Sequence, residues 1–479
     1  MIPDWLAAHA EGRPHRLAIQ TARRSWTYVQ LFEEATGFAA TLRRLGIQPQ
    51  EPVALLIRRG DLFALWVHAL IQARAVLLPL NLRLHPEELQ FQLADSQARF
   101  LLYDEASAEL AQSLKVPGAL LRVDSLEDSQ EHLCREAIDL EEPQALLYTS
   151  GTTGRPKGVW ISYRNHFFSA LGSAAQLGLD PEERWLVPLP LFHVGGLGVL
   201  MRSLIYGTTA VIHERFEAEA VDHALEAEKI TLVSLVPTML YRLLELRQGP
   251  YPPSLRAILL GGSGAPRELL ERAHKLGVPV CLSYGMTETN AQFATLPPSE
   301  SLRKLGSSGL PLPGNQIRIL TPQGFTRTPY TEGEIAVKGP TVTRGYHARP
   351  EANAQAFREG WFLTGDLGFL DEEGYLFVLE RRTDLIISGG ENIYPSEVEG
   401  VLLRHPLVED AAVVAAPDPE WGQIPVAHVV LRKPEVSPEE LQAFCRNHLA
   451  GYKVPKRFVI ATSLPRNAAG KLLRRALRS

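Results

Sequence analysis

One loop constrains this chain more than any other stretch: Tyr148-Thr-Ser-Gly-Thr-Thr-Gly-Arg-Pro-Lys-Gly158. It holds three glycines, three Thr hydroxyls, one Ser hydroxyl and Lys157. Glycine lets the backbone turn its N–H groups toward an anion, hydroxyls donate further hydrogen bonds, and lysine adds a compact positive charge. The loop therefore predicts a polyphosphate site, with a flexible surface loop as the alternative interpretation.

The loop is not a Walker A motif. Pro156 stands where that motif needs its second glycine, and Gly158 rather than Ser or Thr follows Lys157. A different class of nucleotide site is therefore expected.

Composition limits the class of protein. With 479 residues the chain should form two or three domains, and its net charge of −5 gives no sign of a nucleic-acid partner. Cys134, Cys281 and Cys445 form no CxxC pair, which argues against a disulfide framework or a zinc site and favours a reducing, cytoplasmic compartment. The N-terminus lacks signal-peptide features, and no apolar run approaches the roughly 20 residues of a membrane span.

Helical and strand patterns alternate, which predicts an α/β fold: a large N-terminal domain with parallel-rich sheets and helices, and a small α+β C-terminal domain. Residues 53–57 and 257–260 are apolar runs typical of buried strands, and 86–93 have the pattern of an amphipathic helix opened by proline. We expect domains at 1–382 and 383–479, with the boundary after a strand within 375–382. Ser437 and Glu440 form an expected capping box.

Further segments carry chemistry. In Tyr284-Gly-Met-Thr-Glu288, Tyr284 offers an aromatic face, Thr287 a hydroxyl for phosphate, and Glu288 a hard oxygen ligand for Mg²⁺. Asp366 ends Gly360-Trp-Phe-Leu-Thr-Gly-Asp366, and His193 ends Pro190-Leu-Phe-His193. Lys471 closes Leu464-Pro-Arg-Asn-Ala-Ala-Gly-Lys471 in a basic C-terminus.

These segments, in this order, resemble the motifs of the adenylate-forming superfamily, which includes acyl-CoA synthetases, peptide-synthetase adenylation domains and firefly luciferase. The resemblance spans residues 148–471 and implies that a carboxylic acid reacts with ATP to give an acyl-adenylate, which CoA then converts to a thioester. ATP, Mg²⁺ and CoA are the implied small molecules, and a homodimer or tetramer is left open.

The resemblance also assigns roles. Lys471 would bridge the carboxylate and the α-phosphate as the adenylate forms, with Thr287, Glu288 and His193 as the other catalytic residues and Glu288 as the metal ligand. ATP and AMP contacts are expected at Thr149, Ser150, Gly151, Thr152, Thr153, Gly154, Lys157, Gly262, Ser263, Gly264, Ser283, Tyr284, Gly285, Met286, Thr287, Asp366 and Arg381.

The C-terminal domain is expected to rotate about Thr383 and Asp384 between the two half-reactions, bringing the CoA-binding loop into the site. CoA contacts are expected at Ser388, Gly389, Gly390, Glu391, Tyr452, Lys453 and Lys456. Two positions depart from the family pattern: Glu380 precedes Arg381 where glycine is usual, and Thr383 occupies the usual hinge position. The identity of the pivot is therefore open.

Two stretches, 193–202 and 388–399, resemble the o-succinylbenzoate–CoA ligases of menaquinone biosynthesis. The acyl pocket is expected at His193, Gly195, Arg202, Gly262 and Thr289. Arg202 would bind a second carboxylate, because an arginine in an apolar stretch needs an anionic partner or a route to solvent. A surface arginine is the alternative interpretation.

Other functions share some of these features. A medium-chain fatty acid or aryl acid ligase shares every nucleotide motif, and a peptide-synthetase adenylation domain is less compatible with the short C-terminus. Gly261-Gly-Ser-Gly-Ala265 nearly fits the nucleophile elbow of an α/β-hydrolase esterase, but Ala265 replaces the final glycine. A non-catalytic nucleotide-binding protein would not be expected to retain Glu288, Asp366 and Lys471 together.

Overall fold

The computed structural model describes residues 1–149, 156–247, 249–262, 265, 267–380, 385–432, 436–465 and 474–477. The chain divides into two compact units. The first comprises Met1–Leu82, Leu93–Leu147 and Gly158–Leu379, and the second comprises Arg83–Gln92, Tyr148–Lys157 and Glu380–Ser479. The hinge expected near 383–384 lies outside the described residues and stays a prediction.

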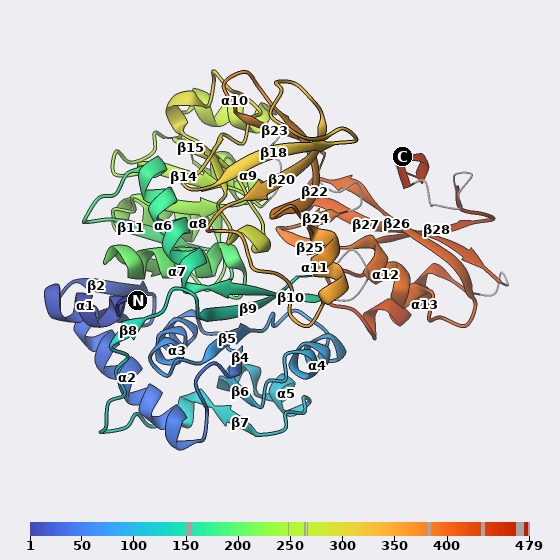
Figure 1. Ribbon diagram of the computed structural model, residues 1–479. Coiled ribbons are helices and arrows are strands. Elements are labelled where there is room, and N and C mark those ends of the chain that lie inside the picture. Colours follow the sequence, from blue (N-terminus) through green and yellow to red (C-terminus); the bar gives the residue numbers. More distant parts are fainter. Residues whose placement is uncertain are drawn as a thin grey trace. The chain divides into compact units, whose positions relative to one another are not determined.

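A nine-stranded sheet forms the largest layer of the first unit (Figure 1). The interior strands β2, β12, β11, β13, β14 and β15 run parallel, as the alternation of apolar strands and helices predicts. In spatial order the strands are β17 (Leu310–Pro311), β16 (Ala294–Leu296), β15 (Val280–Tyr284), β14 (Ala257–Leu260), β13 (Leu232–Leu235), β11 (Arg184–Val187), β12 (Thr209–Ile212), β2 (Leu17–Thr21) and β3 (Ser25–Thr27).

A six-stranded sheet forms a second layer, in which β4 pairs in parallel with β5 and β6. Its order is β10 (Lys157–Ser162), β9 (Pro143–Thr149), β5 (Val76–Pro79), β4 (Pro52–Leu56), β6 (Phe100–Tyr103) and β7 (Ala119–Arg122). The glycine-rich loop thus begins where β9 ends and finishes where β10 begins. Short strands β1 (Ile2–Pro3) and β8 (Ala137–Ile138) pair with each other.

Helices cover both faces of the nine-stranded sheet. Side chains of a strand point alternately to opposite faces, so an interior strand contributes to a hydrophobic cluster on each face. In β14, Ala257 and Leu259 belong to one hydrophobic cluster, while Ile258 and Leu260 belong to another. Strands buried on both faces read as continuous apolar runs, which explains the 257–260 signal. The helices of the first unit are α1 (Trp5–Gly12), α2 (Tyr28–Arg44), α3 (Gly60–Gln72), α5 (Ala108–Gln112), α6 (Tyr163–Leu177), α7 (Val194–Tyr206), α8 (Ala218–Ala227), α9 (Pro237–Leu246), α10 (Arg267–Lys275) and α11 (Pro350–Ala356).

An antiparallel sheet completes the first unit. It carries the long strand β22, which holds Asp366, and comprises β19 (Gly324–Thr326), β18 (Gln316–Thr321), β20 (Gly333–Lys338), β22 (Trp361–Leu370), β21 (Phe357–Arg358) and β23 (Leu376–Glu380). The strand expected within 375–382 is β23.

The second unit is α+β and has its own apolar cluster, which includes Val413, Val429 and Leu441. Its sheet is antiparallel except for the parallel pair β27–β28. The strands are β24 (Ile386–Ser388), β25 (Glu391–Ile393), β26 (Val408–Asp418), β27 (Gly422–Leu431) and β28 (Arg457–Ala461), and the helices are α12 (Pro395–Leu402) and α13 (Pro438–Arg446). Helix α4 (Pro86–Asp95) matches the helix expected at 86–93 and ends two residues later than expected.

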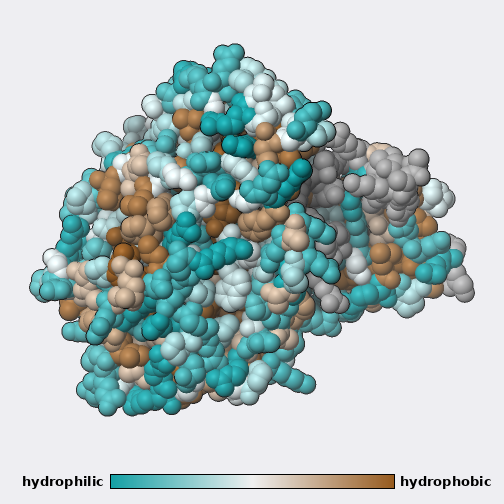
Figure 2. All heavy atoms as spheres, in the orientation of Figure 1, coloured by the Kyte–Doolittle hydropathy of each residue, from teal (hydrophilic) through white to brown (hydrophobic). Residues whose placement is uncertain are grey.

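Hydrophilic residues cover most of the face shown in Figure 2, with smaller hydrophobic patches between them. Exposed large apolar residues such as Leu171, Tyr241 and Tyr330 come from separate segments, as is usual for protein surfaces. No helix in the described ranges has both the length and the apolar composition to cross a membrane.

The capping box of α13 is confirmed: the Ser437 side chain accepts from the Glu440 N–H, and the Glu440 side chain accepts from the Ser437 N–H. Ser437→Ala should lower the free energy of unfolding of the second unit by about 1 kcal/mol. The Glu440 N–H would lose its acceptor, and the reciprocal capping box would be broken. Denaturant melts followed by circular dichroism check this. Ser437→Asp is the matched control, because aspartate also caps helices; equal loss in both variants would contradict the capping role.

Candidate active site

Two distant motifs meet in a hydrogen bond in the first unit. The Tyr284 hydroxyl, at the end of β15, donates to Asp366 Oδ2 on β22 at 2.8 Å. Both residues are buried, and the Asp366 N–H donates to Thr364 Oγ1. An aromatic ring and a carboxylate fixed side by side suit a nucleoside, whose base needs an apolar face and whose ribose offers hydroxyl donors.

The segment after Tyr284 forms a tight loop. Met286 N–H donates to Thr289 Oγ1 at 2.9 Å, and a single 3₁₀ turn covers Thr287–Thr289. Asn290 and Ala291 both have positive φ, at 55° and 71°. Two adjacent non-glycine residues in the left-handed region store backbone strain, which is typical of functional loops. In this loop Thr287 and Glu288 are half-buried, whereas Thr289 is fully buried.

Glu288 is held at both its backbone and its side chain. Its Oε1 accepts from the Tyr346 hydroxyl at 2.9 Å, and its carbonyl accepts from the Thr343 N–H at 2.8 Å. Within the described ranges no group of three or more His, Cys, Asp or Glu side chains could hold a metal. One half-buried carboxylate fits Mg²⁺, which in nucleotide sites takes one or two carboxylates together with phosphate oxygens.

His193 and the glycines after it open helix α7. His193 is the N-cap residue, half-buried, with its ring 4.6 Å from the Phe192 ring. A Cβ on Gly196 would lie 2.4 Å from the Pro190 carbonyl oxygen, so this turn requires glycine there. Gly195 has no such constraint, since among the described residues a Cβ there would meet only Leu189, at 3.5 Å. His193 therefore sits at a fixed position at the start of the helix that carries Arg202.

Arg202 is buried, at 2% exposed, so the surface interpretation is wrong. Its Nη2 donates to Ser169 Oγ at 3.0 Å, its guanidinium lies over the Trp185 ring at 5.6 Å, and its Nε finds no hydrogen-bond partner among the residues that the structure describes. No carboxylate of the described residues lies within ion-pair distance of it. A buried cation without a counter-ion is costly unless a ligand supplies the anion.

The groups around Arg202 are neutral. Burial and the neighbouring Arg202 cation lower the pKa of His166 to about 3, and burial raises the pKa of Tyr206 to about 12. Neither side chain is charged at neutral pH, so the positive charge of Arg202 is not compensated by them. Arginine stays protonated even where burial lowers its pKa, as it does here.

Among the nucleotide residues, Thr149 and Lys157 are the described ends of the glycine-rich loop, at the end of β9 and the start of β10. Gly262 follows β14 with φ of +84°, and Ser283 precedes Tyr284 in β15. Several predicted residues lie outside the described part of the chain: Ser150, Gly151, Thr152, Thr153, Gly154, Ser263, Gly264, Arg381 and Lys471.

In the second unit, the loop predicted for CoA is the tight turn of the β24–β25 hairpin. Ser388 pairs with Glu391, and Gly389 and Gly390 have φ of +57° and +87°. The Gly389 N–H donates to the Trp421 carbonyl at 2.9 Å, and a Cβ on Gly389 would lie 2.7 Å from the Trp421 ring. Glycine is thus required at Gly389 by the backbone conformation and by the indole.

The remaining residues predicted for CoA differ in exposure. Lys456 is exposed and Tyr452 is half-buried, whereas Lys453 is buried and pairs with Glu397 and Glu88. The two carboxylates raise the pKa of the Lys453 ammonium above its usual value, against the effect of burial. A phosphate could reach Lys453 only by replacing these carboxylates, so its role in CoA binding stays a prediction.

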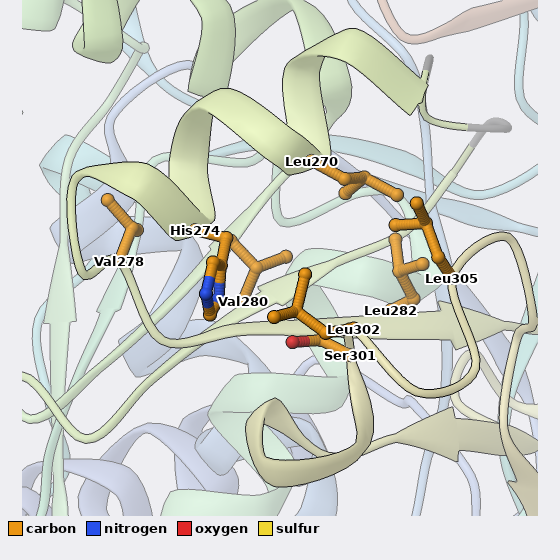
Figure 3. A pocket seen from close by; sticks show the side chains of 8 residues that line it. All are labelled: Leu270, His274, Val278, Val280, Leu282, Ser301, Leu302 and Leu305. Carbon is orange, nitrogen blue, oxygen red and sulfur yellow. The ribbon is translucent and has the colours of Figure 1, made fainter.

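A separate small hollow lies between α10, β15 and residues 301–305 (Figure 3). It is lined mainly by apolar side chains, including Leu270, Val280 and Leu302, and its volume is about 20 Å³. That is room for about one water molecule. The hollow is too small for a nucleotide or an aromatic acid, and nothing in the motifs points to it.

Sequence reasoning missed three groups that the fold brings to the site. Tyr346 contacts Glu288, and Ser169 and His166 lie on α6 near Arg202. A lone Tyr, Ser or His inside an apolar helix or a loop carries no spacing signal, so only the tertiary fold reveals these contacts.

Gly285 allows the loop to close, because a Cβ there would lie 1.4 Å from the Ala291 carbonyl oxygen. Gly285→Ala should displace residues 286–291, lower the melting temperature and abolish ATP-dependent pyrophosphate release. Gly400→Ala is the control, because Gly400 lies in α12 and no atom of the described residues lies within 4 Å of its Cβ position. Its free energy of unfolding should rise by up to about 1 kcal/mol. A Gly285→Ala protein as stable and active as the parent would contradict the packing argument.

Known proteins resemble the chain over its whole length. Residues 6–347 match the AMP-binding enzyme family, and residues 397–471 match the AMP-binding enzyme C-terminal domain. A 2-succinylbenzoate–CoA ligase of Geobacillus kaustophilus is 48% identical, over 100% of this chain and 97% of the relative.

Solved structures of the o-succinylbenzoate–CoA synthetase of Bacillus subtilis are also similar. A double mutant bound with the product analogue OSB-NCoA gives a TM-score of 0.95 at 44% identity, covering 99% of this chain and 98% of that chain. The complex with the acyl-adenylate OSB-AMP gives 0.77 at 44% identity, covering 100% and 98%. The complex with ATP and magnesium gives 0.77 at 43% identity, covering 99% of each chain. The chain therefore belongs to the AMP-binding enzyme family, whose motifs run through the buried contacts described above.

Proposed function

We propose that this protein is an ATP-dependent o-succinylbenzoate–CoA ligase of menaquinone biosynthesis. Two facts support the choice of acid: full-length relatives at up to 48% identity bear that name, and Arg202 is a buried cation lacking a carboxylate partner among the described residues. The Arg202 environment is the observation that carries the choice. The dicarboxylic acid supplies one carboxylate for reaction and one for Arg202.

The reaction has two steps. An oxygen of the acid's carboxylate attacks the α-phosphorus of ATP, and pyrophosphate leaves. The CoA sulfur then bonds to the acyl carbon, the acyl–phosphate oxygen bond breaks, the thiol proton is lost and AMP leaves. Asp366 and Tyr284 would position the nucleoside, and Glu288 would hold Mg²⁺, which neutralises phosphate charge.

The remaining residue roles belong to the proposal. Lys471 would neutralise charge on the reacting phosphorus, and His193 would border the acid near the start of α7. Thr149, Lys157 and the loop between them would hold the phosphates, and Ser388 to Glu391 would line the path of CoA. Rotation of the C-terminal domain about a hinge near 383–384 would convert the site from the first half-reaction to the second. Free Cys134, Cys281 and Cys445 fit action in the cytoplasm.

The other classes fare less well. An α/β-hydrolase esterase needs no ATP and leaves Asp366 and Glu288 without a purpose. An aryl or medium-chain fatty acid has no second carboxylate for Arg202.

Substrate choice is tested by pyrophosphate release with ATP, Mg²⁺ and CoA against o-succinylbenzoate, benzoate, octanoate, palmitate and acetate. We expect strong release with o-succinylbenzoate alone, because only that acid offers Arg202 a second carboxylate. Omission of CoA should leave a single turnover of pyrophosphate, which marks the adenylate. Greater release with octanoate or benzoate would overturn the choice of acid while keeping the ligase chemistry.

Arg202→Ala should raise KM for o-succinylbenzoate by at least about tenfold, the loss expected for a hydrogen bond to a charged group. KM for a monocarboxylate analogue that keeps only the reacting carboxylate should stay near the parent value. Arg164→Ala, an exposed arginine on α6, is the control and should change neither. Equal effects of Arg202→Ala on both acids would remove its role in recognising the second carboxylate.

A further inference from the structure

We propose that Ser169 is a positioning residue that fixes the Arg202 guanidinium for the second carboxylate of the acid; the inference rests on the proposed function. The evidence is a continuous chain of buried polar groups in the first unit, which runs from strand β9 through helix α6 and the loop after Tyr284 to helix α7.

The chain begins at Gln144. Gln144 Oε1 lies 3.0 Å from His166 Nε2, and Asn290 Nδ2 lies 3.3 Å from His166 Nδ1. All three residues are at most 2% exposed. A neutral imidazole with its proton on Nε2 satisfies both contacts, donating to Gln144 and accepting from Asn290. His166 is neutral, since burial and Arg202 lower its pKa to about 3.

His166 thereby holds Asn290, a left-handed residue of the strained loop. The Asn290 carbonyl accepts from the Ser169 hydroxyl at 3.4 Å. With its hydrogen directed to that carbonyl, Ser169 Oγ presents a lone pair to Arg202 Nη2, which donates to it at 3.0 Å. This series of hydrogen bonds sets the direction of the Ser169 hydroxyl. It therefore also sets the position of Arg202 Nη2.

Ser169 Oγ is the one hydrogen-bond partner of the Arg202 side chain among the described residues, and the guanidinium carbon lies 5.6 Å from the centre of the Trp185 ring. Without the hydroxyl, Arg202 would keep its charge and burial but lose its fixed orientation. A planar guanidinium binds a carboxylate through two parallel N–H donors, so orientation decides affinity. Asn290 follows Glu288 and Thr289 in the same loop. This series of hydrogen bonds therefore connects the proposed acid pocket with the loop proposed to bind the metal.

The protein offers a matched control for Ser169. Ser203 neighbours Arg202 on α7 and is equally buried at 1% exposed, and its hydroxyl has no hydrogen-bond partner within the described part of the chain. Ser169→Ala and Ser203→Ala remove the same atom from similar surroundings. Only the first should change recognition of the acid.

We expect Ser169→Ala to raise KM for o-succinylbenzoate by about tenfold with kcat nearly unchanged, and to leave KM for the monocarboxylate analogue unaltered. Ser169→Cys, which keeps the size but bonds weakly, should behave like the alanine variant. In an Arg202→Ala background, Ser169→Ala should have no further effect, because it acts through Arg202. Thermal melts of all variants confirm folding.

Three outcomes overturn the inference. They are equal KM changes for both acids, additive effects of Ser169→Ala and Arg202→Ala, and an unchanged KM in both Ser169→Ala and Ser169→Cys. These outcomes differ from failure of the proposed function, which would appear in the parent protein as absence of selectivity for o-succinylbenzoate.

Discussion

The close approach of Gly285 to the Ala291 carbonyl is the constraint on which the rest of the site depends. It forces residues 286–291 into a compact turn with two left-handed residues. Tyr284, directly before this turn, donates to Asp366. Within the turn, Glu288 accepts from Tyr346, and Asn290 contacts His166 and Ser169. In the proposed function, the residues for the nucleoside, the metal and the acid therefore all adjoin one tightly closed backbone segment. A change in any of these contacts must be accommodated by the same few dihedral angles.

Charge is distributed unevenly across this site. The proposed nucleotide side carries fixed carboxylates, Asp366 and Glu288, each held by a tyrosine hydroxyl. The proposed acid side carries the buried cation Arg202, whose titratable neighbours His166 and Tyr206 are neutral. Buried charges that keep no partner within the protein are expensive, and proteins retain them where a ligand completes the pair. The two sides therefore suit ligands of different kinds: a ribose with a metal-bound phosphate on one, an organic anion on the other.

Much of this was predictable from sequence, and the limits are physical. Local rules identified the buried strand 257–260, the helix from Pro86 and the Ser437 cap, because each depends on neighbouring residues alone. Motif order predicted the family, whereas the contact between Tyr284 and Asp366 was found only in the structure. Burial of Arg202 could not be decided, since an arginine nine residues after His193 on a helix fits either surface or core. Tyr346, Ser169 and His166 reach the site only through tertiary contacts between elements far apart in the chain.

The same reasoning explains why the acid pocket, not the nucleotide site, should separate members of this family. In the proposed function Tyr284, Glu288 and Asp366 would contact groups that every ATP shares, and the loop that carries Glu288 closes only with glycine at Gly285. Arg202 and Ser169 lie on α7 and α6, whose spacing can be kept while side chains change. Replacing the pair by apolar residues of similar volume would remove a costly buried cation and leave the nucleotide loop intact. A ligase for a monocarboxylic acid could thus arise from this fold without altering its chemistry, provided Asn290 kept its contact with His166.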